Sequence, residues 1–600
     1  MDKTRNTAMA ICLGIVAGFL PLLVLGKAYS NHLQENPWFL NQDTSYDFFL
    51  YWKGQGLILI SLILMLIGTY YVISHKGTVA IKTSRDRQVL CLILIYLLGV
   101  LGSVLRSAYK RESIRGGYEQ WEGGIILLCY GILVFMGYFF IRNRASMVIF
   151  LRTTVAGAWI LSLIGVLQFM GLDLFRGKLG QWFMNVTLPT PLHFSFNFGL
   201  GRVYATLYNP NYIGSYVAVL LPLFLYEMFQ EAQKEKGTML NQLFSVLAAS
   251  GMSFLAIMLV GSQSLTGAVA VILELLVLSG KFLYDRRKHK KEIAMYTGVL
   301  VIVGCVLLGS QFPRVRSGLT KLFVVKPNYG FIEQMYSKDN TLYMELENGK
   351  SCTLQTSKET EAGEGMVTLV GKTEGRTIFQ TKIQRNQEYI TPADTFERMH
   401  IRWTVNNELK IQTKYSREYK VIMPEAKEGF RCKNGMARVA HLRKIPKAGF
   451  KRSQKAFSRR GYIWSRTIPL LKNYLILGAG PDQFVRIFPN DDYVGKVNNG
   501  FSGQIITKPH NLFLQIWCQT GLISLLAYLA LWILALKSGM ERIRRQTEKA
   551  EKYREFLLVL ALTGYQIAGL INDSIICVAP IYWILVGICL GKEDIQHDEP

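Results

Sequence analysis

Long apolar blocks constrain this chain more than any other feature of its sequence. Each block is about 17–25 residues long, which is the length of helix that crosses a hydrocarbon core of roughly 30 Å. Their number predicts an all-α polytopic membrane protein with about twelve transmembrane helices. The predicted spans are about 8–26, 55–74, 88–105, 123–142, 148–170, 211–229, 242–261, 264–283, 295–312, 511–535, 555–571 and 575–591.

The composition of the chain agrees with this membrane interpretation. The 600 residues have a mean hydropathy of +0.20 and are 50% hydrophobic, and their formal net charge is +26. So apolar a chain is not a basic nucleic-acid-binding protein, and no basic stripe with interleaved aromatic residues is found. The positive charge fits cytoplasmic loops, which collect Lys and Arg, with anionic substrates or lipid headgroups as a second explanation.

The distribution of Lys and Arg predicts the side of the membrane that each loop faces. With a cytoplasmic N-terminus, the inside loops include "DRRKHKKE" and "KSGMERIRRQTEKAEKYR", whereas the outside loop "NHLQENPWFLNQDTSYD" has no Lys or Arg. The loop "RSAYKRESIRGGYEQWE" is the exception, since it places basic residues outside. The positive-inside rule therefore predicts a multi-pass protein of the cell membrane with both termini in the cytoplasm.

The same topology divides the chain into four regions. Residues 1–200 hold the first five spans and an outer loop, and residues 201–312 hold spans six to nine. Residues 313–510 form a large extracytoplasmic loop, and residues 511–600 hold the last three spans and a cytoplasmic tail. The polar stretch 171–210 faces outward as well, so the polar motifs described below share one side of the membrane.

Within the large loop, residues 320–445 carry strand patterns. "TLYMELENG", "MVTLVG" and "RTIFQTKI" alternate apolar and polar residues between Gly and Asn turns, and "RWTVNNELKIQ" predicts a hairpin with a two-residue Asn-Asn turn. We expect a small β-rich inserted domain without catalytic residues. Cys352 and Cys432 both lie in this loop, and the sequence does not decide whether they form a disulfide. No Cys-x-x-Cys spacing, which is typical of metal sites, occurs in the chain.

Polar and charged residues recur at the outer ends of predicted spans. In "GRVYATLYNPNYIG", Arg202, Asn209 and Asn211 lie against the sixth span, and "KPHN" places His510 before a late span. Each has a structural explanation when taken alone, because an Asn-Pro-Asn turn starts helices and an interfacial His is commonly only amphipathic. Asp573, between the last two spans, has a comparable role as a helix cap. Their position on one side of the membrane favours a shared site instead.

An anionic lipid headgroup is the ligand that such a set of residues would bind. Arginine holds phosphate oxygens with a planar bidentate fork and keeps its charge, and a helix N-terminus adds N–H donors and a positive dipole end. A histidine takes a proton from an attacking hydroxyl group near neutral pH. If arginines neutralise a leaving pyrophosphate, the reaction needs no metal ion and no other cofactor.

These motifs resemble the O-antigen ligase/polymerase family, whose members share the Wzy C domain. The matching stretches are "RVYATLYNPNYIGSYVAVLLPL", "RGYIW" followed by "LILGAGPDQF", "HNLFLQIWCQTGLISLLAYL" and "NDSIICVAPIYWILVGICLG", in the family's order over about 200–592. The β-rich insert departs from the family's compact loop and leaves the acceptor open. The resemblance implies a helical membrane bundle that transfers or polymerises glycans carried on undecaprenyl pyrophosphate, without metal or nucleotide.

The resemblance also implies roles for individual residues. Arg202 and Arg460 match arginines that hold the pyrophosphate, and His510 matches a loop histidine that assists the acceptor hydroxyl, so these three are the expected catalytic residues. Arg459 is an alternative to Arg460, because the spacing to Trp464 is the only guide. The candidate substrate-binding residues are Arg202, Arg460, Arg459, Asn209, Asn211 and Trp464.

The leading hypothesis is a glycosyltransferase, either ligase or polymerase, at the outer face of the cytoplasmic membrane. Its expected partners are the undecaprenyl-pyrophosphate-linked glycan, an acceptor glycan, lipid or protein, and membrane lipids, with no nucleic acid. A transporter or flippase of lipid-linked sugars is the alternative, although charges at span centres are few and no internal repeat is evident. A receptor is a third hypothesis, for which no cytoplasmic signalling domain is recognised.

The predicted topology can be tested by labelling. A cysteine introduced near residue 400 should react with a membrane-impermeant thiol reagent in intact cells, because the large loop faces outward. A cysteine near residue 287, in a basic cytoplasmic loop, should react only after the cells are opened. Labelling near 287 with protection near 400 would reverse the topology and place the polar motifs on the cytoplasmic side.

Overall fold

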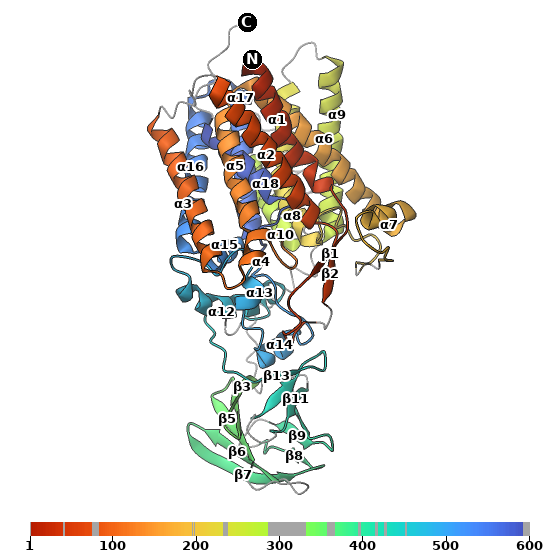
Figure 1. The fold of residues 1–600 in the computed structure, drawn as a ribbon, viewed down its shortest axis with the longest axis vertical. Helices are drawn as coiled ribbons and strands as arrows, with labels where there is room; N and C mark the ends of the chain where they lie inside the picture. Colours follow the sequence, from red (N-terminus) through yellow and green to blue (C-terminus); the bar gives the residue numbers. More distant parts are fainter. Residues whose placement is uncertain are drawn as a thin grey trace.

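A computed structural model describes most of the chain, and all statements below refer to its described residues. These are residues 2–39, 43–74, 83–194, 196, 198–231, 238–285, 332–356, 366–393, 398–413, 418–424, 429–450 and 453–591. A body of long helices forms one part of the molecule, and a β-domain lies at one end of it (Figure 1). The first helix begins at the opposite end of the body (Figure 1).

The long helices confirm that the chain is mostly helical and rich in candidate membrane spans. Among the described residues, seven helices are long and apolar enough to cross a membrane, and two shorter ones, α5 and α18, are also apolar. The predicted span 295–312 lies outside the described residues, so a total of twelve remains a prediction. The helices of the body are α1 (Asp2–Gly18), α2 (Tyr51–Ser74), α3 (Ser84–Arg106), α5 (Gly124–Phe140), α6 (Arg144–Phe169), α8 (Pro210–Glu231), α9 (Met239–Ser262), α10 (Leu265–Asp285), α16 (Leu522–Arg545), α17 (Lys549–Gly569) and α18 (Ala579–Gly591).

The predicted span 511–535 is wrong in one respect, because the helix is broken at Gly521. A short helix, α15 (Leu512–Thr520), ends there, and the long helix α16 begins at Leu522. Gly521 has a φ of 93°, and a Cβ at this position would lie 2.2 Å from the carbonyl oxygen of Ile476. His510 therefore precedes a short separate helix, and α16 extends further toward the C-terminus than the sequence pattern predicted.

The short helices α12 (Ala456–Thr467), α13 (Phe484–Ile487) and α14 (Tyr493–Asn499) lie between the helical body and the β-domain (Figure 1). The Gly-Ala-Gly turn packs there against α15, since Ala479 and Gly480 donate backbone hydrogen bonds to Cys518 and Gln519. The short elements of the chain are η1 (Leu20–Leu22), β1 (Lys27–Ser30), β2 (Thr44–Asp47), α4 (Lys110–Arg115), η2 (Leu174–Arg176), α7 (Lys178–Asn185), α12 (Ala456–Thr467), η3 (Ile468–Asn473), α13 (Phe484–Ile487) and α14 (Tyr493–Asn499).

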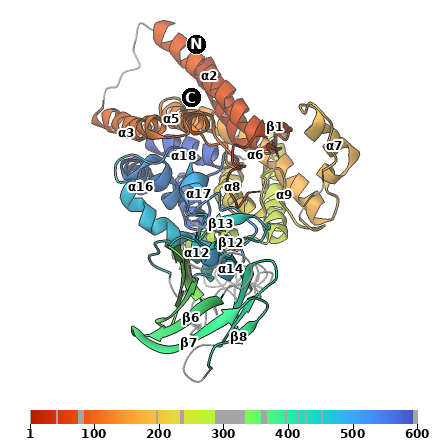
Figure 2. The same ribbon diagram turned by 60° about the horizontal axis from the view of Figure 1, so that its bottom comes forward.

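Two antiparallel sheets make up the β-domain, as the alternating pattern within 320–445 predicts (Figures 1 and 2). The five-stranded sheet has the order β3-β4-β5-β6-β7 and the six-stranded sheet the order β13-β12-β11-β10-β9-β8, so each is a meander. Their strands are β3 (Ile332–Lys338), β4 (Thr341–Leu346), β5 (Lys350–Thr356), β6 (Met366–Thr373), β7 (Arg376–Gln384), β8 (Glu388–Ile390), β9 (Met399–Trp403), β10 (Glu408–Thr413), β11 (Tyr419–Ile422), β12 (Arg431–Lys433) and β13 (Val439–His441).

One detail of the β-domain differs from the expectations, and a second answers a question that the sequence left open. The β9–β10 hairpin does not have a two-residue turn, because Thr404 pairs with Glu408 and Asn407 takes a left-handed φ of 60°. Asparagine tolerates that conformation, which closes a longer hairpin loop. Cys352 and Cys432 are buried free thiols rather than a disulfide, since each packs in the apolar core of the domain.

The loop that follows β1 fastens the β-domain to the rest of the molecule. Trp38 is 1% exposed and belongs to the core of the β-domain together with Tyr493 of α14. Arg438 donates hydrogen bonds to the backbone carbonyls of Gln34, Asn36 and Phe39. The domain is thus docked by a loop that is about 400 residues away in the sequence.

We predict that residues 332–445 expressed alone give a β-rich circular dichroism spectrum, because the two sheets enclose their own apolar core. After unfolding without reductant, both Cys352 and Cys432 should react with a thiol reagent. In the full-length protein, Trp38→Ala should lower the unfolding free energy of the docked domain by about 3–5 kcal/mol, the usual cost of truncating a buried Trp. A random-coil spectrum of the isolated segment would contradict the two-sheet core.

Candidate active site

A cavity of about 550 Å³ opens where the helical body meets the short elements, and we call it the His510 cavity. Its volume lies in the range of roughly 300–1,000 Å³ that is usual for small-molecule sites. It combines basic, aromatic and amide side chains from segments far apart in the sequence. The lining residues are Trp38, Phe39, Tyr118, Glu119, Tyr208, Asn209, Asn211, Tyr212, Met436, Ser458, Arg460, Ile463, Phe501, Gly503, Gln504, Ile505, Ile506, Thr507, Lys508 and His510.

A histidine–carboxylate pair stands at this cavity. Nδ1 of His510 lies 2.9 Å from Oδ2 of Asp573, whose side chain is fully buried, whereas the imidazole is 38% exposed. Burial alone would raise the pKa of Asp573, but its interaction with His510 and the positive charges of Lys508 and Arg460 hold it below its ordinary value. A charged carboxylate next to Nδ1 favours the tautomer that carries its proton on Nδ1, and this tautomer presents Nε2 as the basic nitrogen.

Arg460 is the arginine that lines the cavity. One guanidinium nitrogen lies 3.4 Å from Oδ1 of Asn572, and another lies 3.5 Å from the carbonyl oxygen of Phe457. Burial lowers the pKa of Arg460, and the negative charge of Asp573 opposes this shift. A guanidinium group keeps its proton under such conditions. Its two long hydrogen bonds leave donor capacity that an anionic ligand would use.

Lys508 adds a second buried positive charge that the sequence motifs did not single out. Its Nζ donates to the carbonyl oxygen of Glu119 at 2.6 Å and to the hydroxyl of Tyr212 at 3.1 Å, and the residue is 3% exposed. Burial would lower the pKa of Lys508, but Tyr212, Glu119 and Asp573 outweigh burial and raise it. Lys508 is therefore charged, and it faces the same cavity as Arg460.

The start of α8 forms one wall of the cavity, as the Asn-Pro-Asn motif predicts. The Asn209 side chain accepts a hydrogen bond from the Asn211 backbone at 2.9 Å, which shapes the first turn of the helix. Asn572 donates to the Asn211 carbonyl and to the Ser215 hydroxyl. Because α17 packs along α8, the link between α17 and α18 brings Asn572 and Asp573 to this helix start.

Trp464 and Arg459 take positions around the cavity rather than in its wall. The Trp464 indole donates to the Pro509 carbonyl at 2.9 Å, so it fixes the backbone next to His510. Arg459 is exposed and lies over the Phe501 ring at 5.9 Å. Trp464 is therefore a positioning residue, and of the two arginines that the spacing left open, Arg460 reaches the cavity.

Arg202 is not among the residues that line the His510 cavity. Its guanidinium donates to Oε1 of Gln263 at 3.0 Å, at the junction between α9 and α10. The backbone of the next residue, Val203, pairs with Gly261, which anchors this segment to the end of α9. Of the three expected catalytic residues, the structure brings Arg460 and His510 together and leaves Arg202 beside α9.

Backbone conformation also marks this cavity. The residues Glu119, Tyr208, Ser458 and His510 line it and have left-handed φ angles between 51° and 72°. Such conformations are unfavourable for residues with a side chain and persist where the surrounding structure holds them. They turn the chain sharply at the cavity wall, and none of the four residues that take this conformation is a glycine.

The sequence motifs do not single out Asn572 and Lys508, although "KPHN" and "NDS" contain them. Asp573 belongs to the polar set at the span ends, but the sequence assigns it no role in the reaction. Their signal was proximity in sequence to His510 and to the last span. Within the described part of the chain, no group of three or more His, Cys, Asp or Glu residues is arranged to hold a metal ion.

Comparison with known proteins identifies the domain that supplies most of this cavity's basic residues. Residues 420–529 match the family model described as O-antigen ligase (Wzy_C). The searches of curated proteins and of solved structures find no match. The matched range contains Arg460, Lys508 and His510, whereas Arg202 and Asp573 lie outside it. The similarity to the O-antigen ligase family thus lies in the domain at residues 420–529.

Proposed function

We propose that this protein is a glycosyltransferase that moves a glycan from undecaprenyl pyrophosphate to an acceptor hydroxyl at the outer face of the cytoplasmic membrane. The observation that carries the proposal is the meeting of Arg460, Lys508 and the His510–Asp573 pair at one cavity. The O-antigen ligase domain supports the same class of membrane glycan-processing reaction. The acceptor is a different molecule in a ligase and another lipid-linked glycan in a polymerase, and the donor chemistry is the same in both.

The proposed reaction divides two tasks between these residues. Nε2 of His510 takes the proton of the acceptor hydroxyl, while Asp573 holds Nδ1 and stabilises the imidazolium that forms. The acceptor oxygen forms a bond to the anomeric carbon, and the bond from that carbon to the pyrophosphate oxygen breaks, which inverts the anomeric configuration. Arg460 and Lys508 neutralise the pyrophosphate as it leaves with its lipid.

A buried carboxylate that orients a histidine favours chemistry over transport. A flippase or transporter of lipid-linked sugars needs positive charge for the headgroup, but it needs no base whose tautomer is fixed. The 2.9 Å distance between Oδ2 of Asp573 and Nδ1 of His510 supports a role of this pair as an oriented general base. The outward orientation of the cavity follows from the predicted topology. The helix α12, which contributes Arg460 to the cavity, lies at the end of the helical body opposite the start of α1 (Figure 1).

We predict that His510→Ala and Asp573→Asn each lower kcat for glycan transfer by about 10²–10⁴-fold, because both remove the oriented general base. The double variant should lose little more than either single variant, since the two side chains act as one unit. Purified protein with a lipid pyrophosphate-linked glycan and an acceptor provides the rates. His441→Ala, which removes an exposed histidine of β13, is the matched control and should keep normal turnover. Additive losses in the double variant would contradict the coupled pair.

The two neighbouring arginines of α12 give a sharp test of the anion site. Arg460→Ala should abolish or severely reduce transfer at normal protein levels in the membrane, whereas Arg459→Ala should leave it nearly unchanged, because only Arg460 lines the cavity. Arg460→Lys should rescue poorly, since an ammonium group lacks the bidentate fork. Arg202→Ala should have a smaller effect than Arg460→Ala. Equal activity of the Arg459 and Arg460 variants would refute this anion site, and loss of wild-type activity with a chelator would refute a metal-free reaction.

A further inference from the structure

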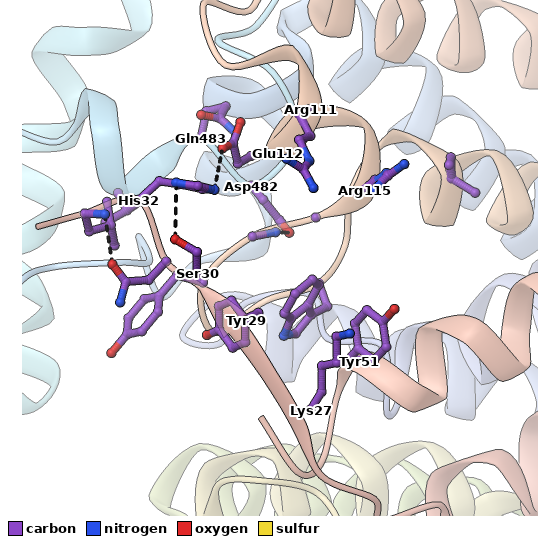
Figure 3. A pocket seen from close by; sticks show the side chains of 18 of the residues that line it. Lys27, Tyr29, Ser30, His32, Tyr51, Arg111, Glu112, Arg115, Asp482 and Gln483 are labelled. Carbon is purple, nitrogen blue, oxygen red and sulfur yellow. Dashed lines mark hydrogen bonds and ion pairs between the residues drawn. The ribbon is translucent and has the colours of Figure 1, made fainter. Parts of the chain in front are cut away.

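A second cavity of about 600 Å³ lies beside the first, and we call it the Trp121 cavity. Tyr118 lines both cavities, so the two adjoin each other at this residue. The wall of the Trp121 cavity comes from β1 and its following loop, the starts of α2 and α5, α4, and the loop and short helix near Asp482. Figure 3 shows Lys27, Tyr29 and Tyr51 on the side of the cavity opposite Arg111 and Glu112.

Cations outnumber anions around this cavity. Arg111 and Arg115 are exposed, and within the described part of the chain neither forms a hydrogen bond or an ion pair. Lys27 lies 5.0 Å over the Tyr51 ring and adds a third positive charge. Glu112 is a partly buried carboxylate among them, at 3.9 Å from the His32 imidazole. An anionic ligand would find uncommitted positive charge here.

The wall also contains buried polar atoms that lack a hydrogen-bond partner among the described residues. They are Oδ1 of Asp482, Oε1 of Gln483 and Nε1 of Trp121, on side chains that are 8% exposed or less. Asp482 uses its other oxygen to accept from the backbones of Gly117 and Glu122, both at 2.9 Å. A buried polar atom without a hydrogen-bond partner lowers the stability of the folded protein. Two such acceptors and one such donor occur together in this wall.

An aromatic cluster completes the wall. Trp121 contacts Tyr29 and Tyr51 edge to face, with ring centroids 4.8 and 4.9 Å apart. A sugar ring presents hydroxyl groups that both donate and accept hydrogen bonds, and C–H faces that pack on aromatic rings. The combination of unpaired acceptors, an unpaired N–H donor, aromatic rings and free arginines therefore fits a saccharide that bears negative charge better than it fits a simple anion.

We propose that the Trp121 cavity binds an acidic saccharide unit of the glycan that is handled at the neighbouring His510 cavity. Asp482, Gln483 and Trp121 would bind hydroxyl groups, and Arg111 and Arg115 would bind the acidic substituent. The involvement of this saccharide in transfer rests on the proposed function, whereas its binding does not. The saccharide belongs either to the acceptor or to the outer part of the donor glycan, and the chemistry that recognises it is the same.

Binding to the full-length protein in detergent tests the site directly. The probes are a four-unit oligogalacturonate and neutral maltotetraose, measured by calorimetry. We expect oligogalacturonate to bind at least tenfold more tightly than maltotetraose, with an affinity that falls as salt is raised. Arg111→Ala combined with Arg115→Ala should weaken oligogalacturonate binding about tenfold or more, and Trp121→Phe should weaken binding of both probes. No binding, or equal affinities for both probes, would overturn the proposal.

The matched control removes the same charge elsewhere. Arg376→Ala combined with Lys382→Ala takes two exposed cations from β7 of the β-domain and should leave oligogalacturonate binding unchanged. His510→Ala should bind oligogalacturonate like the wild type, so a failure of the proposed transfer reaction would leave this result intact. An affinity in the Arg111/Arg115 variant equal to that of the wild type would refute the site.

A transfer assay then distinguishes the two sources of the saccharide. If the cavity holds acceptor sugars, the Arg111/Arg115 variant should raise KM for the acceptor and leave KM for the lipid-linked donor unchanged. If it holds the outer sugars of the donor, the opposite split is expected. Unchanged KM values for both substrates would refute the link between the two cavities.

Discussion

The buried carboxylate of Asp573 is the constraint on which the candidate site depends. A charge without exposure to water is costly unless other charges and hydrogen bonds compensate for it. Here the compensation comes from His510, Lys508 and Arg460, which belong to two other segments of the chain. Separating these segments would leave buried charges without compensation, which is costly. The interactions among these charges therefore favour an arrangement in which the α17–α18 link, the segment before α15, and α12 meet at one cavity.

Neighbouring contacts keep these segments in register. Asn572 joins the α17–α18 link to the first turn of α8, and Trp464 joins α12 to the backbone next to His510. A buried pair between Arg466 and Asp492, at 2.7 Å, fastens α12 to α14 in turn. Polar contacts thus position the candidate base and the candidate anion site, in addition to the apolar packing of the helices.

The β-domain has a different relation to the site. Its sheets enclose their own core, and the described contacts that dock it run through Trp38, Arg438 and α14. Trp38 also lines the His510 cavity, and Lys496 of α14 lies 4.1 Å over its ring. The same tryptophan therefore contributes to the docking of the domain and to the wall of the cavity, which gives the domain a physical route to influence the cavity without supplying its reactive groups.

Two features could be predicted from the sequence because their signals are local. The length of an apolar block indicates a long helix, and alternation at a period of two indicates a strand, and both kinds of element are present. The motifs also predicted that Arg460, His510 and the start of α8 belong to one site. The break at Gly521 and the longer β9–β10 turn could not be predicted, because each is set by a left-handed backbone conformation that the packing of neighbouring segments selects.

The sequence by itself thus determined the helical character, the strands of the insert and the identity of several polar residues near the site. Only the tertiary structure decided which of these residues meet. It brought Asp573 and Arg460 to the cavity at His510, separated Arg460 from its neighbour Arg459, and placed Arg202 on Gln263. The physical reason is that a buried charge is compensated only by side chains that lie close to it in space. Which side chains lie close together in a helical bundle depends on how the helices pack, and no local sequence pattern encodes that packing.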